Sequence, residues 1–160
     1  MVSNRTYDTT ATSPAPLFAT IVGAAFLLVG VLGFIPGITT NVGDMEFAGH
    51  DSGAELLGIF QVSILHNIVH LLFGVVGLWA ARQGWRVART YLLAGGAIYL
   101  VLWVYGLIVG QEDDANFVPV NTADDWLHFA LGLGMIALGL LATPRSRRAA
   151  RTTDGRPIVA

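Results

Sequence analysis

Four long apolar stretches decide what this chain can fold into. They run from about 17 to 35, 56 to 81, 88 to 109 and 126 to 142. Each is close to or above the ~20 residues that an α-helix needs to cross the ~30 Å hydrocarbon core of a bilayer. Barrel strands would alternate polar and apolar residues, whereas these stretches are apolar almost throughout. The sequence therefore predicts an all-α integral membrane protein with four transmembrane helices in a bundle.

The composition agrees with a membrane protein. Only 12% of the residues are charged, whereas soluble domains carry ~25%. The chain has no cysteine, which excludes disulfides, thiolate metal sites and cysteine nucleophiles. We expect the lipid bilayer as the main partner, other membrane subunits or a second copy of the chain as further partners, and no nucleic acid.

The chain divides into three parts. Residues 1–16 form a polar leader, residues 17–143 the transmembrane domain and residues 144–160 a basic tail. The first apolar stretch is longer than the ~7–15-residue apolar core of a signal peptide, and no convincing cleavage motif follows it. We therefore interpret it as a retained membrane span.

The charged residues separate the two ends of the predicted bundle. Nine of the eleven acidic residues lie in the first and third connections, and no positive charge lies there. Because positively charged loops stay in the cytoplasm, we expect both termini and the middle loop to be cytoplasmic. The positive residues are Arg5 in the leader, Arg82, Arg86 and Arg89 in the middle loop, and Arg145, Arg147, Arg148, Arg151 and Arg156 in the tail.

The two halves of the chain share short patterns. The first stretch ends in GFIPG, residues 33–37, and the third in GLIVG, residues 106–110. The histidines of Leu65-His66 and Leu127-His128 are each followed, eleven residues on, by Gly-Leu. These matches predict two similar hairpins with His66 equivalent to His128. Chance is the alternative explanation, because glycine and leucine are common throughout the chain.

Glycines recur at intervals of seven residues, at Gly23 and Gly30 in the first stretch and at Gly132 and Gly139 in the fourth. Such small residues let helix backbones approach closely in lipid. The third stretch carries a bulky side that includes Tyr99, which would either fill a pocket or face lipid.

Polar residues interrupt two of the apolar stretches. They are His66, Asn67 and His70 in the second and His128 in the fourth. Because hydrocarbon solvates such groups poorly, ionisable side chains in a span usually face the bundle interior or a wet cavity. His66 and His128 lie 16 and 17 residues before the next arginine, so both rings should lie at a similar depth, in the outer part of the membrane. His70 lies one turn deeper on the same face as His66.

Three interpretations of this polar cluster are open. In the first, the imidazoles and the Asn67 amide form hydrogen bonds between helices and have a structural role. In the second, His66 and His128 ligate the iron of a haem b. In the third, the cluster is a quinone, proton or lipid site, with Asp124, Asp125 and His128 at its mouth and His70 as the inner relay. A zinc site is less favoured, because no HExxH or equivalent spacing is present.

The second outer connection ends in a helix-start pattern. Thr122 is followed three residues later by Asp125, before the apolar run begins, as in a capping box. Asp124 and Asp125 would then lie favourably at a helix N-terminus. The chain has no glycine-rich phosphate loop and no nucleophile elbow, so an enzyme is the less favoured class.

Several segments resemble a known family. They are GVLGFIPGIT, LHNIVHLLFGVVGLWAAR and NTADDWLHFALGLG, and the last contains the pattern N-x-x-D-x-x-x-H formed by Asn121, Asp124 and His128. Over residues 17–141 the chain resembles small four-span membrane proteins, common in actinobacteria, that are catalogued as domain of unknown function 4383. The resemblance implies a multi-pass protein of the bacterial inner membrane and brings no established activity.

These observations predict a non-enzymatic membrane protein with an accessory, assembly or structural role. The alternative is a haem, quinone or proton-handling protein built on His66, His70 and His128.

Overall fold

Four long helices make up the transmembrane part of the molecule. The computed structural model describes residues 12–111, 113 and 115–144. The helices are α1 (Ala15–Leu32), α2 (Ile64–Arg82), α3 (Trp85–Ile108) and α4 (Thr122–Leu141), and each is long and apolar enough to cross a membrane. The four-span helical fold is therefore confirmed. Most of the leader and the basic tail, with six of the nine arginines, lie outside the described residues.

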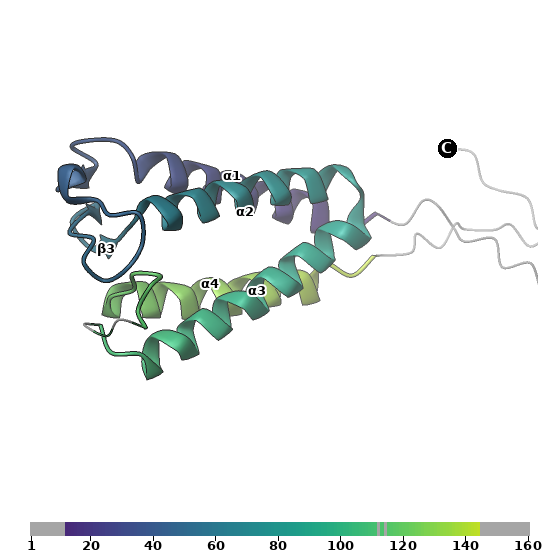
Figure 1. Cartoon of the computed structure of the whole chain (residues 1–160). Helices are drawn as coiled ribbons and strands as arrows, with labels where there is room; N and C mark the ends of the chain where they lie inside the picture. Colours follow the sequence, from purple (N-terminus) through teal and green to yellow (C-terminus); the bar gives the residue numbers. More distant parts are fainter. Residues whose placement is uncertain (1–11, 112, 114, 145–160) are drawn as a thin grey trace, which may run out of the picture.

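The helices pack as two antiparallel hairpins. In Figure 1, α1 and α2 lie side by side, α3 and α4 form the second pair, and the hairpins join where α2 runs into α3. The turn between α2 and α3 is short because Gly84 adopts a φ of 100°, a conformation that glycine enters without steric cost. The α1–α2 and α3–α4 connections both lie at the opposite end of the bundle, which is called the outer end below after the orientation expected from the sequence (Figure 1).

Many large apolar side chains point away from the bundle. A soluble protein rarely exposes such a continuous apolar surface, whereas in a bilayer these residues contact lipid. Those at least half exposed in the helices include Leu17, Ile21, Leu28, Leu72, Val75, Trp79, Val101, Leu107, Ile108, Leu140 and Leu141.

The second helix starts later than the apolar pattern predicts. We expected a span from residue 56, whereas α2 begins at Ile64. Ser63 has extended backbone, and its hydroxyl accepts a hydrogen bond from the His66 amide at 3.1 Å. Such an N-cap satisfies an amide that has no partner within the helix. The other helix ends differ from the predicted spans by only a few residues.

The apolar residues before Ser63 belong to a small cap on the outer end. Three short strands, β1 (Thr39–Thr40), β2 (Glu55–Leu56) and β3 (Phe60–Gln61), form an antiparallel sheet in the order β1-β2-β3. A short 3₁₀ turn, η1 (Val42–Asp44), follows β1. The cap has its own apolar core, which packs on the end of α1 and contains Ala54, Leu56 and Val62 with Val29, Leu32, Ile38, Met45 and Phe60.

Each hairpin is held together internally by the same type of close backbone contact. A Cβ atom added to Gly23 of α1 would lie 2.9 Å from the Gly74 carbonyl oxygen of α2. A Cβ atom added to Gly96 of α3 would lie 2.7 Å from the Gly132 carbonyl oxygen of α4. Only glycine permits backbones to approach this closely, which in lipid compensates for the missing hydrophobic attraction between helices.

A second pair of contacts repeats nearer the outer end. Gly33, directly after α1, lies against the Asn67 amide, and Gly106 of α3 lies against the Asp125 carboxylate. Along α1 and α3 the repeat therefore keeps the register predicted from GFIPG and GLIVG. Because the two hairpins also run in the same direction (Figure 1), an approximate twofold axis along the bundle relates them.

The register along α2 and α4 differs from the prediction. Since Asn67 is equivalent to Asp125, His70 and not His66 is the equivalent of His128. His66 is instead equivalent to Asp124. The alignment based on Gly-Leu was wrong by one helical turn, because leucine and glycine recur on successive turns and do not define a unique match.

Candidate functional site

Three histidine rings meet inside the outer half of the bundle. The ring centroid of His66 lies 4.5 Å from that of His70 and 6.4 Å from that of His128. Their exposed fractions are only 8%, 6% and 3% respectively. The structure therefore brings together the two helices whose histidines the sequence placed at similar depth.

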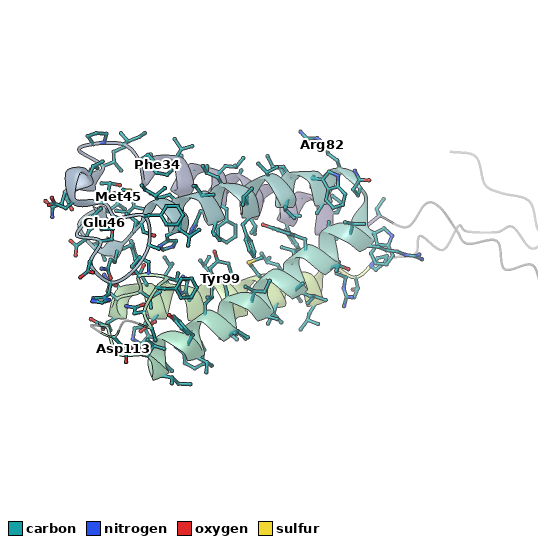
Figure 2. All side chains as sticks on the ribbon, in the orientation of Figure 1. Phe34, Met45, Glu46, Arg82, Tyr99 and Asp113 are labelled. Atoms are coloured by element: carbon teal, nitrogen blue, oxygen red, sulfur yellow. The ribbon has the colours of Figure 1, made fainter. Side chains whose placement is uncertain are left out.

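Two aromatic rings support the histidines where the hairpins meet. Phe26 of α1 lies 5.5 Å from His70, and Tyr99 of α3 lies 5.3 Å from His128. The Phe26 and Tyr99 rings stack on each other at 5.3 Å. Figure 2 shows Tyr99 between the two hairpins. Tyr99 thus fills the bundle interior, a choice that the sequence left open.

The polar residues at the start of α4 have a structural role. The Asn121 side chain accepts hydrogen bonds from the amides of Ala123 and Asp124, and the Asp124 carboxylate accepts one from the Asn121 amide. This capping box begins one residue earlier than the predicted pair of Thr122 and Asp125. The prediction failed because two pairs fit the capping-box pattern, Asn121 with Asp124 and Thr122 with Asp125, and the sequence does not decide between them.

Asp124 also connects α4 to the outer cap. Its carboxylate accepts a hydrogen bond from the backbone amide of Gln61 in β3 at 3.0 Å. The side-chain amide of Asn121 donates a hydrogen bond to the Ile59 carbonyl oxygen at 2.8 Å. The cap is therefore tied to the second hairpin as well as to α1. Gln61 and Ile59 were missed from the sequence because they lie in a segment that was read as helix.

The hydrogen-bond partners of the histidines differ. His70 Nδ1 lies 3.0 Å from the His66 carbonyl oxygen within α2, so this bond does not join helices. The Nδ1 atoms of His66 and His128 are buried and have no hydrogen-bond partner among the described residues. An unmet hydrogen bond in a buried polar group is costly, so these two atoms call for a partner beyond the described side chains.

Asn67 faces away from the histidine rings toward α1. Its amide lies against Gly33 and is 3.8 Å from the Met45 sulfur. Asn67 follows His66 by one residue and so lies about 100° from it around the helix, which explains why the two side chains meet different neighbours.

A cavity of about 240 Å³ lies beside the three histidines. Its walls are almost entirely apolar and come from α1, α2, α4 and the outer cap. The polar residues that line it are His66, Asn67, His70, Asp124 and His128. A mostly apolar cavity with a few converging polar groups has the usual character of a small-molecule site.

A second cavity of about 210 Å³ lies between α2 and α3 and is lined by the same three histidines. Leu65, Val69, Tyr99 and Leu102 form its apolar walls. The imidazoles therefore separate two cavities on different sides of the bundle.

The described residues do not form a conventional metal cluster. Within residues 12–111, 113 and 115–144, no group of three or more His, Cys, Asp or Glu side chains is arranged to hold a metal ion.

A protein-family comparison matches residues 17–141 to the family described as "Domain of unknown function (DUF4383)". No curated protein and no solved structure matches the chain.

Proposed function

The chain belongs to the DUF4383 family, and since that description gives no activity, we propose a function from the site itself: a non-enzymatic membrane protein that binds a lipid-soluble quinone. The polar head of the quinone would occupy the cavity beside His66, His70 and His128. Its apolar tail would extend between helices into the bilayer. An accessory role in a membrane complex is compatible with such binding.

The observation that carries the proposal is a group of buried imidazole rings in the wall of an apolar cavity. His66 and His128 both line this cavity, and the Nδ1 atom of each has no hydrogen-bond partner among the described residues. A neutral imidazole offers either a donor or an acceptor at each ring nitrogen. Quinone carbonyls accept hydrogen bonds and quinol hydroxyls donate them, so both redox forms would find a partner here.

The size of the cavity favours a ring-sized head group. Sites that enclose whole drug-sized ligands usually have volumes of ~300–1,000 Å³, and the cavity here has about 240 Å³. A quinone needs only its head enclosed, because lipid can surround its tail. A haem macrocycle would need more enclosed space, although the 6.4 Å between the His66 and His128 rings keeps haem as the second candidate.

We also propose that the outer cap faces away from the cytoplasm, in the inner membrane of a bacterium. Arg82, Arg86 and Arg89 lie around the turn between α2 and α3, and the acidic outer connections lie at the other end (Figure 2 labels Arg82 and Asp113 at opposite ends). The positive-inside rule places the arginine end in the cytoplasm. The site then lies in the half of the membrane distant from the cytoplasm.

The test is quinone binding by the full chain in lipid nanodiscs. A short-tailed benzoquinone and a short-tailed naphthoquinone are titrated separately while intrinsic tryptophan fluorescence and the melting temperature are followed. Saturable binding that weakens in His128→Phe and not in His50→Ala supports the proposal. His50 is the matched control, because it lies in the outer loop, 3.5 Å from Asp51.

The same samples separate the alternatives. Absence of saturable binding of either quinone would refute the proposal. A Soret band in the visible spectrum, lost in His66→Ala and His128→Ala, would establish haem in its place. Loss of stability in these variants without any ligand signal would support a purely structural role for the histidines.

A further inference from the structure

The approximate twofold axis relates the two cavities to each other. Leu102 of α3 is the equivalent of Val29 of α1, and Val69 of α2 is the equivalent of Leu127 of α4, in the register given by the glycine contacts. Val29 and Leu127 line the first cavity, whereas Leu102 and Val69 line the second. From this relationship we infer that each chain carries two quinone-head sites, one on each side of the histidine cluster.

Part of the polar wall of the two cavities follows the same relationship. His70 and His128 exchange places under the twofold operation, and both line both cavities. His66 also lines both. The cavities have similar volumes, about 240 Å³ for the first and about 210 Å³ for the second. Each cavity therefore offers a ring-sized apolar space against the same three histidines, with Asn67 and Asp124 added in the first cavity and Ser63 in the second.

Both cavities are covered at their outer ends by the two outer connections. Leu56, Leu57 and Phe60 of the cap line the first cavity, and Phe117 and Val118 of the second connection line the second. The connection within the first hairpin thus covers the first cavity, and the connection within the second hairpin covers the second, although the two connections differ in sequence and length. Head groups in both cavities would be shielded from the outer solution and approached from the lipid.

The inference rests on the proposed quinone binding and adds its stoichiometry. The experiment is equilibrium binding of a short-tailed quinone to the full chain in nanodiscs, with the number of sites per chain determined at saturation. Val29→Trp fills the first cavity and Leu102→Trp the second. Val101→Trp is the control, because Val101 is 68% exposed on the lipid side of α3.

The expected result is two molecules per wild-type chain and per Val101→Trp chain, and one per chain in either Val29→Trp or Leu102→Trp. One molecule per wild-type chain, unaffected by Leu102→Trp, would overturn the second site and leave the proposed function intact. No binding by the wild type would refute the proposed function itself.

Cross-linking tests the same inference without any substitution. A photoreactive azidoquinone is irradiated with the wild-type protein, and the labelled peptides are identified by mass spectrometry. Labelling of both the segment around Leu56–Phe60 and the segment around Phe117–Val118 is expected. Competable labelling confined to one of the two segments would contradict the inference.

Discussion

The rings of Phe26 and Tyr99 stack at 5.3 Å on the approximate twofold axis that relates the two hairpins. The two residues are equivalent in the repeat, and each also contacts the histidine of its own hairpin, His70 or His128. This stacked pair therefore joins the two halves of the molecule beside the histidine cluster. The relationship gives matched variants, because the same change can be made in each half.

Phe26→Ala and Tyr99→Ala should both destabilise the protein, by about 3–5 kcal/mol, because each removes a large buried ring and leaves a cavity. Phe26 is 4% and Tyr99 2% exposed. Thermal unfolding in detergent checks the prediction. Phe47→Ala is the control and should change the melting temperature little, since Phe47 is 63% exposed in the outer cap. Unchanged unfolding of both inner variants would mean that the hairpins do not meet through this pair.

Gly23→Ala and Gly96→Ala should each cost about 1–3 kcal/mol, because overpacking forces the backbones apart. The added methyl group would meet a carbonyl oxygen of the neighbouring helix at 2.9 Å or 2.7 Å. Gly134→Ala provides the control, since a Cβ atom there would have no neighbour within 4 Å. Chemical denaturation of the three variants measures the difference. Equal stability of all three would contradict the close helix contacts.

Asn121→Ala should lower the free energy of unfolding by about 0.5–2 kcal/mol, the usual cost of losing an N-cap. The neighbouring Thr122→Ala should have a smaller effect, because among the described residues the Thr122 hydroxyl accepts a hydrogen bond from the exposed Gln111 side chain and does not cap the helix. Thermal unfolding of the two variants shows which residue, Asn121 or Thr122, is the N-cap of α4. A larger loss in Thr122→Ala would restore the capping pair first expected from the sequence.

Single cysteines at Gln83 and Asp113 should react on opposite sides of the membrane. The chain has no cysteine of its own, and both side chains are exposed. In spheroplasts, a membrane-impermeant maleimide should label Asp113→Cys and leave Gln83→Cys unlabelled until the cells are opened. Labelling of Gln83→Cys in intact spheroplasts would reverse the orientation, and labelling of both would contradict the four-span fold.

His66→Phe should weaken quinone binding about 3- to 10-fold, which corresponds to the ~0.5–1.5 kcal/mol net value of one hydrogen bond. His70→Phe should have a different signature, because its Nδ1 is already engaged with the His66 carbonyl oxygen at 3.0 Å. We expect it to lower the melting temperature more than the affinity. Titration and thermal unfolding of both variants separate the two effects, and an unaffected affinity in His66→Phe would remove this residue from the site.

The sequence alone determined the four membrane spans and the depth of the histidines. Hydrocarbon imposes a minimum apolar length on any helix that crosses it, and that length can be read residue by residue. The same reasoning placed His66 and His128 at a similar depth, and the structure brings their rings to 6.4 Å. The division between an arginine-rich end and an acidic end likewise follows from the sequence, because the two kinds of charge fall in different connections.

Only the tertiary structure decided which side chains meet. In a bilayer both the inner and outer faces of a helix are apolar, so periodicity did not show that Tyr99 points inward or that His70 is the equivalent of His128. Those choices follow from close backbone contacts such as Gly23 with Gly74, which depend on packing rather than on hydrophobicity. The apolar segment before Ser63 was misread as helix for a related reason. Its apolar side chains serve the core of the outer cap, and local composition cannot distinguish burial in protein from burial in lipid.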